Sequence, residues 1–64
     1  MSRIEMLELA NLDRHIETIE ALIPVRYPDA TAEQFEHFRG ELFDAETTAA
    51  KLEVTRDWLE WLVC

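Results

Sequence analysis

Apolar side chains recur at helical spacing near the start of the 64-residue chain. Successive intervals of 3, 4, 3 and 4 residues separate Leu9, Leu12, Ile16, Ile19 and Ile23. Such intervals place all five side chains on one face of an α-helix. Pro24 follows directly, and proline has no amide hydrogen and restricts the residue before it. We therefore expect a first helix over about residues 3–23 that ends before Pro24.

The beginning of this first helix carries its own signal. Ser2 and Glu5 have the spacing of a capping box, in which a hydroxyl and a carboxylate satisfy the free amides of the first turn. The segment Arg3–Leu9 also alternates loosely between polar and apolar residues, as a short strand would. A helix that begins after Asn11 is thus an alternative, although a single strand would have no partner.

A second helix is expected over about residues 32–43. Phe35, Phe38 and Leu42 follow at intervals of 3 and 4, and Thr31 with Gln34 provides a second capping box upstream. Gly40, the single glycine, lies inside this pattern and costs about 1 kcal/mol there relative to alanine.

A third helix is expected over about residues 45–63, with Asp44 as its N-cap. Its expected core face consists of Ala45, Ala49, Leu52, Leu59 and Val63. Arg56 interrupts this face, and its aliphatic stem can pack there while the guanidinium reaches water. Because the apolar face continues from the second segment, one continuous helix through Asp44 is an alternative.

Together these patterns predict a single all-α domain over residues 1–64, a small three-helix bundle. The stretch from Pro24 to Asp29 is expected to be a short linker between helices. A chain of this length buries only about 60 % of the surface that its unfolded form exposes, so marginal stability and no deep cleft are expected.

The charge balance indicates which partners to expect. Six Lys and Arg against 14 Asp and Glu give a net charge of −8, and the six basic residues are scattered. Phosphates and anionic lipids are bound mainly by basic side chains, so direct binding to nucleic acid or to anionic membranes is not expected. The charge favours a basic partner instead.

Location and disulfides follow from composition. The longest apolar run has four residues, Trp61–Cys64, far below the roughly 20 that a membrane span needs, and the first ten residues lack the apolar core of a secretory signal. The single cysteine, Cys64, leaves no internal disulfide. We therefore expect a protein of a reducing cytoplasm.

The sequence offers no catalytic set, so neither an enzyme nor a cofactor is expected. Ser2 and Lys51 are the single serine and lysine, and there is no glycine-rich phosphate loop. His37 has Glu33 and Glu41 four residues away on either side, but one imidazole with carboxylates is a poor zinc set. We interpret His37 as a surface histidine and expect no metal.

Acidic residues gather in rows once they are placed on the expected helices. These rows are Glu46, Glu53, Asp57 and Glu60 on the third helix, Asp13, Glu17 and Glu20 on the first, and Glu33, Glu36, Glu41 and Asp44 on the second. The first two rows each fall within about 60° of the helix circumference, and no base is expected beside the row on the third helix. One interpretation is a solvated surface that keeps the protein soluble. The other is a row of carboxylates that a basic groove accepts in place of phosphates.

An aromatic face is a second candidate feature. Val54, Trp58 and Trp61 follow at intervals of 4 and 3, away from the expected core face of the third helix. This helix could be central, with the tryptophans filling the core between the other two helices. Alternatively, the three residues form an exposed apolar interface for a partner or a second copy.

In size, acidity, helix content and lack of catalytic residues, the chain resembles the small phage-encoded anti-CRISPR proteins, and most of all inhibitors of type I systems. Some of that group resemble DNA in charge. The resemblance implies a partner, the DNA-recognising subunit of a CRISPR effector complex, and a mechanism, electrostatic and steric exclusion of target DNA. The alternative is a helical interaction module, antitoxin-like or subunit-bridging, that uses the Trp58 and Trp61 face. A monomer or weak homodimer fits either function.

Overall fold

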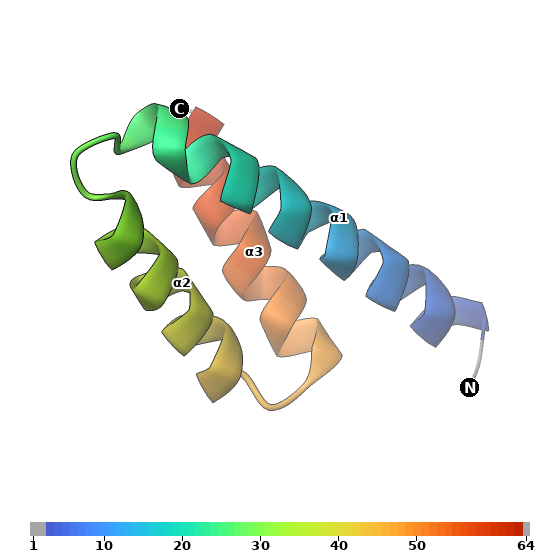
Figure 1. Cartoon of the computed structure of the whole chain (residues 1–64). Coiled ribbons are helices and arrows are strands. Elements are labelled where there is room, and N and C mark those ends of the chain that lie inside the picture. The colour runs from blue at the N-terminus through green and yellow to red at the C-terminus, as the bar shows by residue number, and fades with distance from the viewer. Residues whose placement is uncertain (1–2, 64) are drawn as a thin grey trace.

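The computed structural model describes residues 3–63, apart from the side chains at positions 4 and 5. Three helices make up the fold: α1 (Arg3–Arg26), α2 (Thr31–Asp44) and α3 (Thr48–Val63). The predicted all-α three-helix bundle is therefore confirmed (Figure 1). The expected capping box of Ser2 and Glu5, and the thiol of Cys64, lie outside the described residues.

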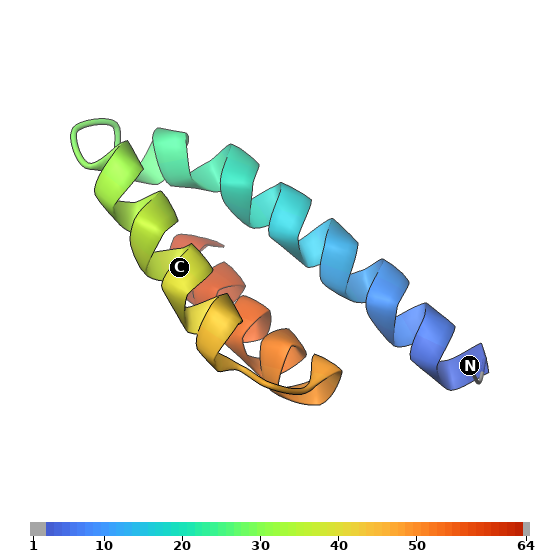
Figure 2. The ribbon, with the colours of Figure 1, turned by 60° about the horizontal axis from the view of Figure 1, so that its bottom comes forward.

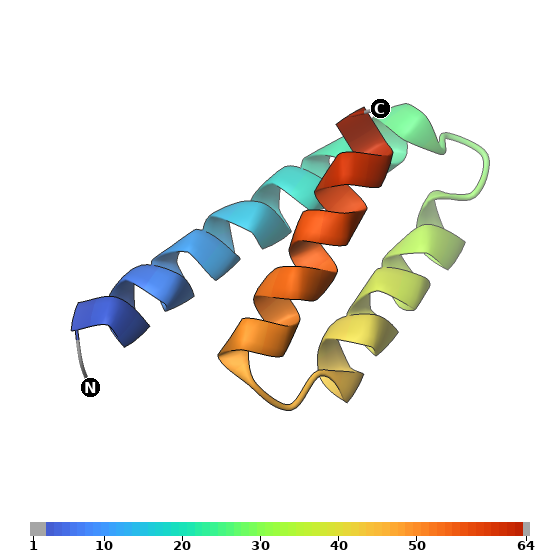
Figure 3. The ribbon, with the colours of Figure 1, turned by 180° about the vertical axis from the view of Figure 1, so that it is seen from behind.

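The three helices are unequal in length, and this decides the shape of the molecule. Helices α2 and α3 run in opposite directions beside each other, and α1 packs mainly against α3. The first turns of α1 extend past the ends of the other two helices (Figures 2 and 3). Met6 and Leu7 on this extension are accordingly exposed. The alternative of a strand over Arg3–Leu9 is wrong, because α1 covers it.

Five apolar side chains form the centre of the core, two from α1, one from α2 and two from α3: Ile19, Ile23, Phe38, Trp58 and Leu62. Phe38 meets Trp58 edge to face, with ring centroids 5.3 Å apart, which is a favourable aromatic geometry. The apolar faces predicted for the first two helices are confirmed at Leu12, Ile19, Ile23 and Phe38. Leu9, at the other end of the predicted face of α1, is exposed because it precedes the packed region.

The core face predicted for the third helix is wrong except at Leu59, which is half-buried and packs against the core. The buried residues of this helix are Thr55, Trp58 and Leu62, whereas Ala49 is exposed and Val63 has 73 % of its surface exposed. Turning the helix this way buries the large indole of Trp58, which outweighs the small alanines. Arg56 is exposed and does not pack into the core.

Burial of Thr55 is compensated by hydrogen bonds. Its hydroxyl donates to the Leu52 carbonyl at 2.9 Å and lies 3.1 Å from His15 Nδ1 on α1. A buried hydroxyl with such partners avoids the cost of an unsatisfied polar group. Thr55 and His15 therefore link α3 to α1.

The first interhelical break falls later than predicted. Pro24 lies inside α1, which continues to Arg26, and the amide of Tyr27 donates to the Ile23 carbonyl at 2.8 Å. Pro24 is exposed and lies in the last turn of α1, where the one hydrogen bond that its missing amide removes costs less than it would in the helix interior. The expected capping by Thr31 is also wrong: Ala30 is the N-cap of α2, and the Thr31 hydroxyl instead donates to the Tyr27 carbonyl at 2.7 Å.

The second break separates α2 from α3 at residues 45–47, so the predicted division into two helices is confirmed and the alternative of one continuous helix is wrong. The third helix begins three residues later than predicted, and Asp44 is not its N-cap. Asp44 ends α2, and Ala45 has an extended backbone. The N-cap of α3 is Thr47, whose hydroxyl accepts a hydrogen bond from the amide of Ala50 at 3.1 Å.

The end of α2 is capped by a lysine side chain from α3. Lys51 Nζ donates to the carbonyls of Leu42 at 2.6 Å and Ala45 at 2.5 Å. It thus supplies the positive charge that the end of α2 lacks.

Gly40 lies in the interior of α2, and a Cβ built there meets no atom within 4 Å. We expect Gly40→Ala to raise the free energy of unfolding by about 1 kcal/mol, because alanine restricts the unfolded chain without a clash in the helix. Urea unfolding monitored by circular dichroism measures this change. Ala21→Gly, at an exposed position inside α1, is the matched control and should lower stability by a similar amount. A destabilising Gly40→Ala would contradict this account.

Candidate interaction surface

The acidic row on α3 is present but shorter than predicted. Glu53, Asp57 and Glu60 are exposed and lie on the side of the helix opposite Thr55, Trp58 and Leu62. Glu46 precedes the first residue of α3 and so lies outside the row. The remaining three carboxylates span about 10 Å of the helix axis.

One basic side chain flanks this row, contrary to the prediction. Arg56 lines the same surface hollow as Glu53, Asp57 and Glu60, between α3 and His15 of α1. Its guanidinium does not come within 4.0 Å of a carboxylate in the described part of the chain. The row therefore keeps its negative charge, with one arginine at its edge.

The acidic residues of the other two helices are also at the surface. Asp13, Glu17 and Glu20 are exposed on one side of α1, and Glu33, Glu36 and Asp44 are exposed on α2. Among the side chains that the structure describes, the one ion pair joins His37 Nε2 to Glu41 Oε1 at 3.9 Å. Most of the acidic groups therefore face water without a basic partner.

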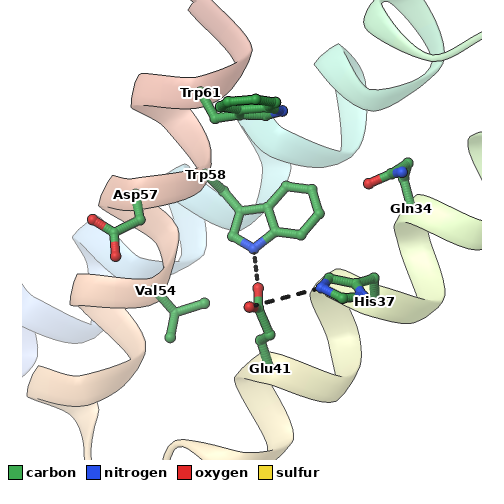
Figure 4. A pocket seen from close by; sticks show the side chains of 7 residues that line it. All are labelled: Gln34, His37, Glu41, Val54, Asp57, Trp58 and Trp61. Carbon is green, nitrogen blue, oxygen red and sulfur yellow. Dashed lines mark hydrogen bonds and ion pairs between the residues drawn. The ribbon is translucent and has the colours of Figure 1, made fainter.

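Glu41 departs from the outward position expected for it. Its carboxylate accepts a hydrogen bond from the indole Nε1–H of Trp58 and so points toward α3 (Figure 4). Its side chain remains 47 % exposed. The pairing satisfies the polar atom of a buried tryptophan and leaves the other carboxylate oxygen toward His37.

The predicted aromatic face divides between core and surface. Trp58 is buried, Val54 is half-buried and Trp61 is 64 % exposed. Trp61 Nε1 donates to the hydroxyl of Tyr27, which links the end of α3 to the first interhelical turn. The three residues therefore do not form one exposed apolar patch.

These aromatic and acidic side chains meet at a hollow of about 300 Å³ between α2 and α3. Its lining consists of Gln34, His37, Glu41, Val54, Asp57, Trp58 and Trp61. In Figure 4 the Trp61 ring lies above the Trp58 ring, with Asp57 on one side and His37 and Gln34 on the other. Asp57 also belongs to the acidic row, so the hollow and the row are adjacent.

No protein-family model, curated protein or solved structure matches the chain.

Two further properties of the described residues bear on possible functions. Among the side chains that the structure describes, which exclude that of Glu5, no three His, Cys, Asp or Glu come together in a way that could hold a metal ion. None of the three helices is both long and apolar enough to traverse a lipid bilayer.

The hollow as a unit has no signal in the sequence, although some of its members do. Helical spacing identifies Glu41 and His37 as neighbours on one helix, and Trp58 and Trp61 as neighbours on another. What brings the two pairs together is the packing of α2 against α3, which depends on Trp58 being buried. Gln34 gave no signal beyond its supposed capping role.

Proposed function

We propose that this protein binds a basic nucleic-acid-binding surface and blocks DNA from it by charge mimicry and steric exclusion, as in anti-CRISPR inhibition of a type I effector complex. The observation that carries the proposal is the acidic row Glu53, Asp57 and Glu60 on the outer face of α3, exposed and without an ion pair in the described residues. A groove that is lined by basic residues attracts such a surface through the same long-range field that attracts phosphates.

The spacing of the row supports this proposal. Three charges over about 10 Å give a mean separation of about 5 Å along the axis, whereas one strand of duplex DNA carries a charge about every 3.4 Å. The row is thus sparser than DNA but comparable in scale. Further exposed acidic residues on α1 and α2 add to the field, and the formal net charge is −8.

The proposal also explains an apparent disadvantage in the sequence. Glu53 and Asp57, like Asp13 and Glu17, are like charges four residues apart, and such pairs cost about 0.2–0.5 kcal/mol each. Because the protein is expected to be only marginally stable, an acidic surface that lowers its stability is more readily explained if that surface has a function.

The experiment is inhibition of DNA binding at two salt concentrations. Labelled target duplex is bound to a type I effector complex, and its displacement by the protein is followed by fluorescence anisotropy at 50 mM and 300 mM NaCl. We expect the apparent affinity of the protein for the complex to fall at least tenfold at the higher concentration, because screening weakens exposed charge pairs. Complex formation alone, measured by calorimetry at both concentrations, separates this effect from the salt dependence of the DNA itself. Binding that is unchanged by salt would overturn the proposal.

The alternative, a helical interaction module that uses the Trp58 and Trp61 face, has less support because Trp58 is buried in the core. Trp61 remains available to a partner and is considered next with the carboxylates around it.

A further inference from the structure

The hollow between α2 and α3 combines two kinds of group that attract a cation. The ring of Trp58 and the exposed ring of Trp61 line it with Glu41, whose carboxylate points toward Trp58, while Asp57 lies at the edge of the hollow with its carboxylate turned away from the rings (Figure 4). Aromatic faces attract cations through their quadrupole, and carboxylates add a direct charge. Its volume of about 300 Å³ is at the lower end for ligand pockets, which suits one side chain better than a large ligand.

No lysine or arginine of the described residues lines the hollow. Lys51 Nζ binds the carbonyls at the end of α2, Arg39 lies over the ring of Phe35 at 5.6 Å, and Arg56 lines the hollow on the other side of α3. His37 is the one imidazole in the lining, and its Nε2 lies 3.9 Å from Glu41 Oε1. No guanidinium or ammonium of the described residues reaches Glu41 or Asp57 within 4.0 Å, so an external cation can still be attracted there.

We propose that this hollow binds an arginine side chain of the basic partner. Arginine fits better than lysine, since its flat guanidinium stacks on an indole while its N–H groups donate to carboxylates, and it loses its hydration more readily than an ammonium. Glu41 provides a carboxylate acceptor beside the rings and the Gln34 carbonyl a neutral one, while Asp57 adds a negative charge at the edge of the hollow. Because Asp57 also belongs to the acidic row, an arginine in the hollow would fix the register of the row on a basic groove. The identity of the partner rests on the proposed function, but the chemistry of the hollow does not.

Intrinsic fluorescence provides a direct test, because the chain contains two tryptophans and both line the hollow. The probe is N-acetyl-arginine amide, with N-acetyl-citrulline amide as a neutral analogue of almost the same shape and N-acetyl-lysine amide as the ammonium analogue. We expect a saturable change in emission with a Kd in the millimolar range for the arginine probe, at least fivefold weaker binding of the lysine probe, and no saturation with citrulline.

Charge-neutral variants locate the binding. Asp57→Asn and Glu41→Gln should each weaken binding of the arginine probe at least threefold, and Glu41→Gln keeps an oxygen that can accept the Trp58 indole N–H. Glu60→Gln is the matched control: it removes one charge from the same helix but lies outside the hollow, so the Kd should stay within twofold. Circular dichroism confirms that each variant is folded.

Several results would overturn the assignment. These are equal responses to the arginine and citrulline probes, equally tight binding of lysine, and equal effects of Asp57→Asn and Glu60→Gln. The two proposals fail separately. If the arginine probe does not bind but the protein still inhibits DNA binding in a salt-dependent way, only the arginine site is refuted. If the probe binds but the protein does not inhibit DNA binding, only the proposed function is refuted.

Discussion

Phe38→Ala is expected to lower the free energy of unfolding by about 3–5 kcal/mol, the typical cost of removing a buried phenylalanine ring. Phe38 is 1 % exposed and packs edge to face against Trp58, so its loss removes apolar burial and an aromatic pair together. A 64-residue chain has a total stability of about 3–10 kcal/mol on the usual scale per residue. The variant should therefore lose a large fraction of its stability, and its helical circular dichroism should melt at a temperature at least about 12 °C lower than that of the parent protein.

Phe43→Ala is the matched control, because Phe43 is a phenylalanine of the same helix with 87 % of its surface exposed. Its substitution should change stability by no more than about 0.5 kcal/mol. Urea titrations of both variants, followed by the far-ultraviolet signal, give the two free energies on one scale. Similar losses for Phe38 and Phe43 would mean that the core is not centred on Phe38.

The predictable part of the fold rests on apolar periodicity. Ile19, Ile23 and Phe38 were assigned to core faces because regular intervals of 3 and 4 residues leave one consistent solution for an isolated helix. The face of α3 was assigned wrongly because its apolar residues nearly encircle the helix, and the choice between faces depends on which neighbours lie opposite. The volume of Trp58 and the hydrogen bonds of Thr55 decided it, and both belong to tertiary packing.

Proline and N-cap residues predict the ends of the helices less well, because their effect also depends on the surrounding structure. Pro24 is a strong helix breaker in the interior but is tolerated at an exposed position in a last turn. Asp44 and Thr47 are both good N-caps by residue type, and the sequence does not rank them. In the structure the amide of Ala50 donates to the hydroxyl of Thr47. Lys51 donates to a carbonyl at the end of α2, across the interhelical turn, and the spacing of residues within one helix cannot predict such a contact.

In the candidate interaction surface, too, some features follow from helical spacing and others depend on tertiary packing. Exposure of the acidic residues follows from their spacing on any amphipathic helix, so most of the predicted rows lie at the surface. Two residues depart from the prediction in other ways: the Glu41 carboxylate points toward Trp58, and Arg56 lies at the surface instead of packing into the core. Both follow from how α3 is turned about its axis, and the same turn brings Trp61 and Asp57 to one hollow.

Reversal of the α3 row should abolish most of the proposed inhibitory activity. Each Glu→Lys or Asp→Lys change adds two charges, so the triple variant Glu53→Lys, Asp57→Lys, Glu60→Lys has a net charge of −8 + 6 = −2. We expect its affinity for a type I effector complex to fall about 100-fold at 50 mM NaCl, which is roughly 1 kcal/mol for each reversed charge at the rim of an interface. The measurement is competition with labelled target duplex.

A second triple variant makes the result specific to position. Asp13→Lys, Glu17→Lys, Glu20→Lys on α1 also reaches a net charge of −2 and changes residues that are just as exposed. If the α3 row is the contact, this variant should lose less than tenfold, because it lowers only the long-range attraction and introduces no repulsion at the interface. Equal losses would show that bulk charge rather than an ordered row drives association. A loss confined to the α1 variant would move the contact to α1, where three carboxylates on one side of the longest helix would take the place of the α3 row.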